Sequence, residues 1–393
     1  MTRQVTILGS TGSVGQATLD LLRRAPEGQY SVTALTAHSN LDALCAQARE
    51  FRPRFVAIGD ERLHGALKAA LAGTGIETGA GAKALCEAAA LDADWTMAAI
   101  VGAAGLPPTL EAVRRGKTVA FANKEALVCA GTLFMRTAAE AGTCLLPVDS
   151  EHNAIFQALA GQSMDQVRRI ILTASGGPFR QSSRDAMARA SREDALAHPT
   201  WSMGAKISID SATMMNKGLE IIEACHLFDL PPARVDVLVH PESIVHGLVE
   251  YVDSGLLAQM GSPDMRIPIA HALAWPERLA TSVERLDLAA LGRLTFQAPD
   301  EGRFPALSLA RQAMEEGQAA CILLNAANEI AVEAFLSGQI GFLDIAARVS
   351  DALDWLVHSP FSGHPVSSFE DVFEIDAAAR EETRRQIGLQ AAE

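Results

Sequence analysis

The stretch Val5-Thr6-Ile7-Leu8-Gly9-Ser10-Thr11-Gly12-Ser13-Val14-Gly15 decides the fold of the first part of the chain. Residues 5–8 predict a strand, and the apolar pattern of residues 17–22 predicts a helix. A strand, a glycine-rich turn and a helix can present backbone N–H groups to a pyrophosphate. The spacing G-x-x-G-x-x-G differs from the G-x-G-x-x-G of many dinucleotide sites, and a simple tight turn is the alternative. Its place at the first strand of an alternating segment favours a nucleotide site.

Strands and helices alternate beyond this loop. Further strands are predicted at 30–36, 55–58, 95–100, 118–122 and 144–148, and helices at 41–51, 62–71 and 82–90. This alternation is typical of an α/β fold with a Rossmann-like, doubly wound parallel sheet.

The residues after the second strand bear on the choice of cofactor. An acidic side chain there would bind the ribose 2′-hydroxyl of NAD, but the sequence reads Ala37-His38-Ser39-Asn40. The missing acid favours NADP, and Ser39 and Asn40 could accommodate a 2′-phosphate. The alternative is that these residues only cap the helix that begins near Leu41.

Two carboxylates follow the strand at 144–148, in the stretch Asp149-Ser150-Glu151. Side chains alternate along a strand, so we expect Asp149 and Glu151 on the same side. Like charges repel there unless a cation, a proton or a cationic side chain lies between them. A hard divalent metal is our working hypothesis.

Polar residues recur where later elements end. A strand at 168–174 runs into Ser175-Gly176-Gly177-Pro178, and residues 198–204 form a loop that carries Trp201 and Met203. This loop is a candidate lid over a ligand, although apolar loop residues also patch cores. Residues 207–211 alternate like a half-buried strand that ends at Ser211.

A helix is predicted from about Met214 to Phe228. It places Asn216, Lys217 and Glu220 on one face, because residues three and four positions apart are neighbours on a helix. The alternative is a surface ion pair with a capping asparagine. Asp149, Glu151 and Glu220 together form an all-oxygen set that suits Mg²⁺ or Mn²⁺ better than Zn²⁺.

Donors suited to a small phosphate gather in the same part of the sequence: Ser175, Ser211, Asn216 and Lys217. Lys124 follows a strand of the nucleotide domain, and His198 adds a donor that can titrate near neutral pH. These features predict an enzyme that binds a nicotinamide cofactor and a metal-chelated, phosphorylated substrate. Reduction of a carbonyl suits that combination.

The rest of the chain completes three domains. Strands at 235–240, 245–252 and 256–260, the last two joined by Asp253-Ser254-Gly255, predict an α+β domain with a hairpin. An exposed sheet face there predicts a homodimer. Helices from Ala306 onward through Met314, and at 321–336, 342–356 and 375–387, predict a C-terminal helical bundle. We assign residues 1–149 to dinucleotide binding, 150–278 to catalysis and dimerisation, 279–303 to a linker and 304–393 to the helical domain.

Composition limits the possible partners. The chain has 393 residues, of which 49% are hydrophobic and 20% charged, and its net charge of −14 argues against binding nucleic acid or an anionic membrane. No signal peptide and no apolar run long enough to cross a membrane is visible. The six cysteines are dispersed, without zinc spacing, so we expect reduced thiols in a cytoplasmic protein.

Several motifs in order closely resemble the 1-deoxy-D-xylulose 5-phosphate reductoisomerase family. They are Gly9–Gly15, Ala122-Asn123-Lys124-Glu125, Leu146–Phe156, Ser175–Phe179, Asp210–Glu220, Pro263–Arg266 and Leu324–Glu329. The resemblance implies isomerisation of 1-deoxy-D-xylulose 5-phosphate and its NADPH-dependent reduction to 2-C-methyl-D-erythritol 4-phosphate, in non-mevalonate isoprenoid synthesis. It also implies a homodimer and a site that binds phosphonohydroxamates such as fosmidomycin.

By motif, the resemblance also implies roles for single residues. The metal, Mg²⁺ or Mn²⁺ with Co²⁺ as a further option, would be held by Asp149, Glu151 and Glu220. The substrate would be bound by Lys124, Ser150, Glu151, Ser175, His198, Ser211, Asn216, Lys217 and Glu220, with Lys124, Glu151 and His198 as the catalytic residues. NADPH would lie against Thr11, Gly12, Ser13, Val14, Asn40, Asn123, Glu125 and Gly204, and Trp201 and Met203 would belong to a closing loop.

Two positions depart from the family pattern, and both concern anion contacts to the cofactor. The family often has a basic residue directly after Met-Gly of the loop, where this chain has Ala205 followed by Lys206. It often has Gly-Lys-Asn or Gly-Arg-Asn after the second strand, where this chain has His38-Ser39-Asn40.

Two other functions are alternatives. A short-chain reductase or epimerase would need a Tyr-x-x-x-Lys pair, but Tyr30 and Tyr251 are followed four residues later by Ala34 and Gly255. A non-catalytic NADPH-sensing protein would be supported by a basic DNA-binding helix, which the acidic balance does not favour.

Overall fold

The computed structural model describes residues 2–159, 161–201 and 203–388. The chain divides into two compact units. Unit 1 comprises Met1–Ala126, Phe134–Asn153 and Asp264–Glu284, and unit 2 comprises Leu127–Leu133, Ala154–Pro263 and Arg285–Glu393. The division differs from the domains expected from the sequence, because Asp264–Glu284 group with the nucleotide-binding part and the C-terminal helices group with the α+β part.

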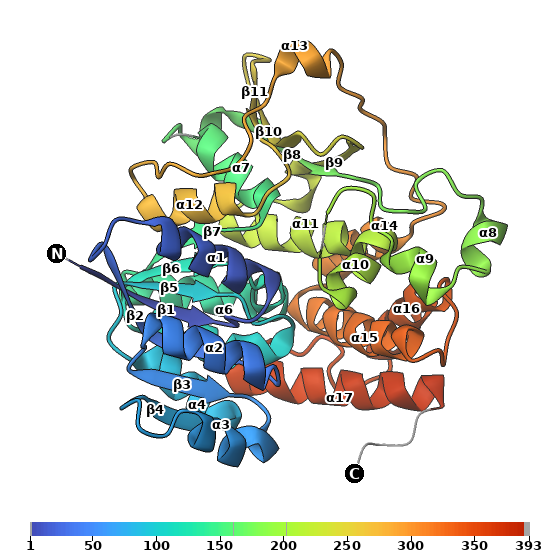
Figure 1. Ribbon diagram of the computed structural model, residues 1–393. Helices are drawn as coiled ribbons and strands as arrows, with labels where there is room; N and C mark the ends of the chain where they lie inside the picture. The colour runs from blue at the N-terminus through green and yellow to red at the C-terminus, as the bar shows by residue number, and fades with distance from the viewer. Residues whose placement is uncertain (1, 160, 202, 389–393) are drawn as a thin grey trace. The chain divides into compact units, whose positions relative to one another are not determined.

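Unit 1 is built on a seven-stranded parallel sheet with the order β4-β3-β2-β1-β5-β6-β7 (Figure 1). The strands are β1 (Arg3–Leu8), β2 (Tyr30–Ala37), β3 (Phe55–Ile58), β4 (Glu77–Ala80), β5 (Trp95–Ala98), β6 (Thr118–Phe121) and β7 (Cys144–Pro147). Most of their residues are buried, as expected for a parallel sheet covered on both faces. The predicted Rossmann-like fold is therefore confirmed, although the sequence analysis missed β4, which has no buried residue.

Helices connect these strands. They are α1 (Ser13–Arg24), α2 (Leu41–Phe51), α3 (His64–Ala70), α4 (Gly81–Ala90), α5 (Leu106–Arg114) and α6 (Lys124–Ala141), with short 3₁₀ turns η1 (Glu61–Leu63) and η2 (Ala103–Gly105). The strand order reverses direction between β1 and β5, so right-handed crossovers place α1–α3 on one face and α4 and α5 on the other. Ligands of such sheets bind at the carboxyl ends of the strands beside this reversal.

Two further helices belong wholly or partly to unit 1. Helix α7 (Ser150–Leu159) follows β7, and α12 (Arg266–Ala274) packs against α1, β6 and β7. Trp95 is fully buried in this unit, and its indole N–H donates to the Ala272 carbonyl of α12 at 3.0 Å. This bond explains why a late segment of the chain groups with the first sheet.

Unit 2 contains a four-stranded sheet with the order β11-β10-β8-β9. Its strands are β8 (Val167–Ala174), β9 (Val235–Val239), β10 (Val245–Tyr251) and β11 (Leu256–Met260), and the 3₁₀ turns η3 (Met164–Gln166) and η4 (Pro232–Arg234) precede β8 and β9. Strands β8 and β9 are parallel, whereas β10 pairs antiparallel with β8 and β11. The predicted hairpin is thus present, and the sheet is mixed.

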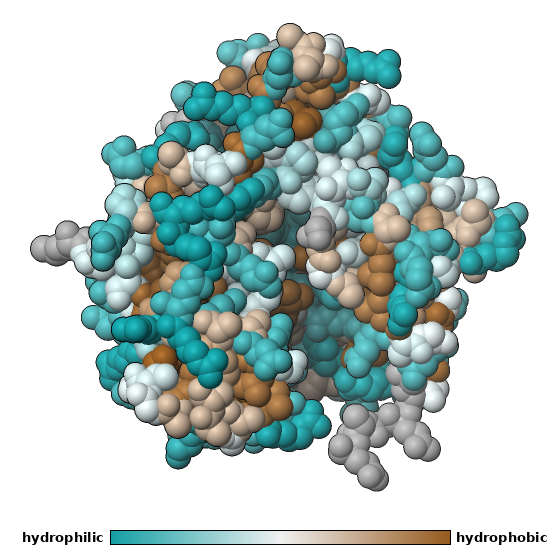
Figure 2. Space-filling model, in the orientation of Figure 1, coloured by the Kyte–Doolittle hydropathy of each residue, from teal (hydrophilic) through white to brown (hydrophobic). Residues whose placement is uncertain are grey.

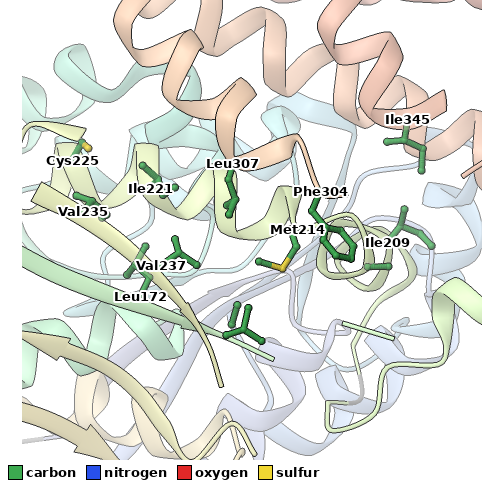
Figure 3. Packing of buried hydrophobic residues seen from close by; sticks show 14 of the residues in the cluster. Leu172, Ile209, Met214, Ile221, Cys225, Val235, Val237, Phe304, Leu307 and Ile345 are labelled. Atoms are coloured by element: carbon green, nitrogen blue, oxygen red, sulfur yellow. The ribbon is translucent and has the colours of Figure 1, made fainter. Parts of the chain in front are cut away.

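One face of this sheet packs against helices to form the core of unit 2. Figure 3 shows Leu172, Val235 and Val237 of the sheet close to Ile221 of α11 (Met215–Leu227) and Leu307 of α14 (Ala306–Glu316). On the other face, a small apolar cluster forms around Ile171, Val245 and Leu248. Alternating side chains on β8 therefore supply both faces.

The remaining helices of unit 2 are α8 (Arg184–Ala188), α9 (Arg192–Leu196), α10 (Ala205–Ala212), α13 (Leu288–Leu291), α15 (Gln318–Leu336), α16 (Asp344–Leu356) and α17 (Phe369–Ile387). Helices α15, α16 and α17 pack against one another, which confirms the predicted C-terminal helical region. Within the described parts of the chain, α15 alone is long and apolar enough to cross a membrane, but 83% of its apolar window is buried in the fold. A core helix passes the same test.

Two sequence expectations about local structure were wrong. Asp149 and Glu151 are not on a strand. Strand β7 ends at Pro147, and the main-chain carbonyl of Asp149 accepts the backbone N–H of Asn153 at 2.9 Å, so Asp149 directly precedes the first turn of α7. Residues 207–211 are not a strand either, because they lie inside α10. In both places a few residues of apparent alternation did not distinguish a strand from a helix end.

Candidate active site

The glycine loop between β1 and α1 has the geometry of a pyrophosphate site. Gly9 has a φ of +86°, and a Cβ there would lie 2.6 Å from the Ala99 oxygen. A Cβ on Gly15 would lie 2.3 Å from the Gly9 oxygen, so only glycine fits at either position. Gly12 is the N-cap of α1 and is exposed, and as a glycine it has no side chain that could cap the first N–H groups of the helix. These groups and the helix dipole suit an anion.

Thr11, Ser13 and Val14 complete this loop, and two asparagines follow the ends of β2 and β6. Asn40 caps α2 by accepting the Ala43 N–H at 3.2 Å. Asn123 caps α6 by accepting the Ala126 N–H at 2.8 Å, and its amide donates to the carbonyls of Ile100 and Gly102. Asn123 is fully buried, so it holds the loop after β5 in place.

Charged residues in unit 1 gather where β6 and β7 end. Lys124 begins α6 and is buried, and its ammonium pairs with the Asp149 carboxylate. The Ser150 hydroxyl donates to the Glu151 carboxylate at 2.7 Å in the first turn of α7. Acidic side chains are favourable at a helix N-terminus. The carboxyl ends of β6 and β7 therefore carry Lys124, Asp149, Ser150 and Glu151, together with the buried Asn123 and Glu125.

The first turns of α11 hold the second charged group, in unit 2. The Asn216 amide donates to one oxygen of Glu220 at 2.5 Å, and the Lys217 ammonium pairs with the other at 2.5 Å. The side chains of Lys217 and Glu220 are 4% and 1% exposed. Burial of both charges excludes the surface ion pair weighed from the sequence. The backbone turns sharply before them, because Met214 has a φ of +63°.

Ser175 and His198 lie together in unit 2. The Ser175 hydroxyl is 2.8 Å from His198 Nε2, while the backbone N–H groups of Thr200 and Trp201 donate to Nδ1 at 3.1 and 2.9 Å. Because Nδ1 accepts, Nε2 carries the proton and donates to Ser175. Burial lowers the pKa of His198, which also favours the neutral ring. The histidine thus fixes the start of the 198–204 loop.

The turn after β8 lies against α10. Gly177 has a φ of +65°, and a Cβ there would be 2.7 Å from the Ser211 oxygen, so the Ser175 turn and the end of α10 approach at backbone distance. The predicted donors Ser175 and Ser211 therefore belong to adjacent segments. Gly204 caps α10, and the Trp201 ring lies 6.2 Å from the His246 ring, centroid to centroid.

A buried chain of polar residues supports α10 from the C-terminal helices. Lys206 pairs with one oxygen of Asp210 at 2.7 Å, and the Asn328 amide of α15 donates to the other at 2.8 Å. Asp210 and Asn328 are almost fully buried. These contacts hold Asp210, which directly precedes Ser211 in α10.

A cavity of about 580 Å³ opens beside the Ser175 turn in unit 2. Its lining includes Ser175, Gly177 and Pro199, with Arg180 and Arg189 as basic residues, but neither Lys217 nor Glu220. The cavity therefore adjoins Ser175 among the predicted phosphate donors, and the charged group on α11 does not line it.

Family models match most of the chain. One described as 1-deoxy-D-xylulose 5-phosphate reductoisomerase matches residues 5–131, its C-terminal domain matches 145–228, and a DXP reductoisomerase C-terminal domain matches 260–382. The 1-deoxy-D-xylulose 5-phosphate reductoisomerase of Bradyrhizobium sp. (strain ORS 278) is 57% identical over 390 residues, covering 98% of this chain and 94% of that protein. The chain belongs to the 1-deoxy-D-xylulose 5-phosphate reductoisomerase family.

Solved reductoisomerases share the fold over nearly the whole chain. The enzyme from Zymomonas mobilis in complex with NADPH matches with a TM-score of 0.90 and 53% identity, covering 98% of this chain and 99% of that one. A reductoisomerase in complex with NADPH, fosmidomycin and magnesium matches with a TM-score of 0.93 and 46% identity, covering 98% of each chain. The resemblance inferred from the motifs is confirmed.

Sequence reasoning did not single out three buried polar residues on or beside the elements of the candidate site. Glu223 is fully buried one turn beyond Glu220, a spacing that the helix prediction could have revealed. Asp210 could have been noticed from its i, i+4 relation to Lys206. Asn328 gave no signal, because its partner lies far away in the sequence.

Proposed function

We propose that this chain isomerises 1-deoxy-D-xylulose 5-phosphate and reduces the product with NADPH to 2-C-methyl-D-erythritol 4-phosphate, with Mg²⁺ or Mn²⁺ as the metal. The observation that carries the proposal is the full-length match to reductoisomerases, one of them solved with NADPH and magnesium. The reaction is a step of non-mevalonate isoprenoid precursor synthesis.

The cofactor would lie on the glycine loop of unit 1. When bound, NADPH supplies the hydride that reduces the carbonyl carbon. Thr11, Gly12, Ser13 and Val14 offer backbone N–H groups to its pyrophosphate, which the exposed start of α1 supports. Asn40, Asn123, Glu125 and Gly204 are assigned to the cofactor by motif, and Asn123 would act through the loop that it clamps.

Asp149, Glu151 and Glu220 would hold the metal. The donor set fits, because all three residues offer carboxylate oxygens, the ligands that Mg²⁺ and Mn²⁺ prefer. Lys124 pairs with Asp149 and Lys217 with Glu220, and a bound ion would replace these ammonium groups at the carboxylate oxygens. When bound, the divalent ion polarises the substrate's oxygens. Glu151 and Lys124 would also face the reacting oxygens, where they can accept and donate a proton.

The phosphate end of the substrate would bind in unit 2. Ser175, Ser211, Asn216 and Lys217 supply hydroxyl, amide and ammonium donors, and His198 orients the Ser175 hydroxyl at 2.8 Å. Ser150 completes the substrate contacts by motif. Trp201 and Met203 would pack over the bound substrate and exclude water, and the His198 bonds to Thr200 and Trp201 tie that loop to the phosphate donors.

A homodimer is the proposed assembly. Strand β11 is an edge strand, and Val252, Leu256 and Leu257 of the β10–β11 hairpin are 66%, 52% and 52% exposed. Figure 2 shows hydrophobic residues on the surface around β11 and α13. An exposed apolar edge favours pairing with another chain. Light scattering should give a dimer for the wild type and a monomer for Leu257→Lys, whereas a wild-type monomer would refute the assembly.

Cytoplasmic location is proposed as well, and the free state of all six cysteines agrees with a reducing compartment.

The decisive experiment is NADPH oxidation with 1-deoxy-D-xylulose 5-phosphate, with and without Mg²⁺ or Mn²⁺. We expect turnover only when both substrate and metal are present. Glu220→Gln should weaken metal dependence and turnover together, since it removes a carboxylate charge from the proposed ligand set. Turnover by the wild type without any divalent metal would refute the mechanism, and unchanged kinetics of Glu220→Gln at limiting Mg²⁺ would remove Glu220 from the site.

A further inference from the structure

We infer that Arg62, in the turn after β3, binds the 2′-phosphate of NADPH and takes the place of the basic residue that the family often carries after β2. The inference rests on the proposed use of NADPH, and it concerns a residue that no motif assigned.

The topology brings the ends of β2 and β3 to one place. Ala37 and Ile58 are paired neighbours in parallel strands, as the adjacent strands in Figure 1 show. The chain continues as His38-Ser39-Asn40 on one side and Gly59-Asp60-Glu61-Arg62 on the other. The Asp60 N–H donates to the His38 carbonyl at 2.9 Å, so the two turns remain in contact beyond the sheet. The end of β2 is where dinucleotide folds distinguish a ribose 2′-hydroxyl from a 2′-phosphate.

The turn after β2 supplies no permanent positive charge. His38, Ser39 and Asn40 are exposed, and the Asn40 side-chain oxygen is already used to cap α2. A Cβ on Gly59 would lie 2.7 Å from His38 Nδ1, which means that the imidazole rests against the turn after β3. A 2′-phosphate bound here would therefore need a cation from that second turn.

Arg62 is the cation that the second turn offers. Its Nε and Nη2 donate to the two oxygens of Asp60 at 2.9 and 2.7 Å, and Nη1 takes no part in this pair. The side chain is 89% exposed, so Nη1 is accessible to a ligand. A guanidinium with one edge fixed is well prepared to bind a phosphate with the other edge.

The acidic residues of the same turn are accounted for. Asp60 also accepts the backbone N–H of Arg62 at 3.0 Å, and the hydrogen bond from Arg62 lowers the pKa of Asp60 to about 2, so this residue stays a carboxylate that orients the guanidinium. The Glu61 carboxylate lies beside Gly81 at the start of α4, as a Cβ on Gly81 would be 2.1 Å from its oxygen. Repulsion of a 2′-phosphate would then come mainly from Asp60, which Arg62 neutralises.

Binding of two small probes tests the inference without turnover. Calorimetry would compare adenosine 2′,5′-bisphosphate with adenosine 5′-phosphate on the full-length protein. Arg62→Ala should weaken the bisphosphate about tenfold, as expected for one charged hydrogen bond at an exposed site, and leave the monophosphate nearly unchanged. In turnover, the preference for NADPH over NADH should fall by about the same factor.

Three further variants separate the effect of the Arg62 charge from side effects of the substitution. Arg54→Ala is the matched control, because Arg54 is an exposed arginine that pairs with Glu77 at the opposite end of β3 and β4, and it should change neither affinity. Ser39→Arg in the Arg62→Ala background should restore bisphosphate binding from the neighbouring turn. Asp60→Asn combined with Arg62→Ala should remain weak for the bisphosphate.

The results distinguish a phosphate contact made by Arg62 from repulsion by an uncovered Asp60 charge. Equal bisphosphate affinity of the wild type and Arg62→Ala would overturn the inference, as would wild-type affinity in the Asp60→Asn, Arg62→Ala double variant, because the loss would then come from an exposed Asp60 charge. A wild type that oxidises NADPH while Arg62→Ala keeps the same NADPH preference refutes only this inference. A wild type that does not oxidise NADPH at all refutes the proposed function instead.

Discussion

Acid should destabilise unit 1 through one buried histidine. His271 lies in α12, is only 7% exposed, and accepts the Asn153 amide on Nδ1 at 3.1 Å. Asn153 also donates to the Pro147 carbonyl at 2.8 Å, so this bond ties α12 to the start of α7. Burial, followed by the nearby charge of Arg278, lowers the pKa of His271 to about 4. Protonation would both bury a charge and remove the acceptor that Asn153 uses.

The sign and size of this loss of stability follow from the difference in proton binding between the folded and unfolded states. The unfolded chain binds this proton with a pKa of 6.5 and the folded chain with a pKa of about 4, so the unfolded state holds more protons between these values. The contribution to stability is fully present above pH 6.5 and is lost as the pH falls toward 4. At about 1.4 kcal/mol for each tenfold change in proton affinity, the loss is at most about 3 kcal/mol.

Urea unfolding of the wild type and His271→Gln at several pH values between about 7.5 and 4 would measure this effect. Glutamine cannot titrate, so the variant should lose less stability than the wild type over that range, with a difference approaching about 3 kcal/mol. His364→Gln, at an exposed histidine, is the control and should follow the wild type. A stability difference between wild type and His271→Gln that is the same at every pH would refute the reasoning.

Three further predictions concern the site. Lys217→Ala should raise the KM for the phosphorylated substrate at least about tenfold and change that for NADPH little; equal effects on both would remove Lys217 from phosphate binding. Gly15→Ala should cost about 1–3 kcal/mol, because its Cβ would lie 2.3 Å from a backbone oxygen, whereas Gly65→Ala in open space should not; thermal unfolding would separate them, and equal melting temperatures would contradict the clash. Asn328→Ala should cost about 1–3 kcal/mol by leaving Asp210 one donor short; denaturant unfolding would show the loss, and wild-type stability would exclude it.

The sheet of unit 1 could be predicted from the sequence because its strands are short apolar runs bounded by turns. Strand β4 was not predicted, because Glu77–Ala80 form an edge strand in which no residue is buried, so its sequence has no apolar run. The strand predicted at 207–211 was wrong because Ile207 and Ile209 alternate, while the Lys206–Asp210 pair at i, i+4 marks a helix. Short runs carry too few residues to fix a period.

The candidate site was predictable where its residues are close in sequence. Asn216, Lys217 and Glu220 meet because helical spacing places them on one face, and the structure confirms that. The same-side placement of Asp149 and Glu151 relied on a strand that ends earlier, so the reasoning was wrong about their local structure. Contacts such as that of Asn328 with Asp210 depend on how distant helices pack, which no local pattern encodes.

The backbone of Met214 links the core of unit 2 to the charged first turn of α11. Its φ of +63° is a left-handed conformation that costs a residue with a side chain about 1–2 kcal/mol, and it immediately precedes the α11 turn with Asn216 and Lys217. Its buried side chain packs in the cluster that includes Phe304 and Ile209 (Figure 3), so tight packing holds the strained turn. Substitutions that loosen this cluster would let the turn relax, so the placement of Asn216 and Lys217 would change through residues that touch neither of them.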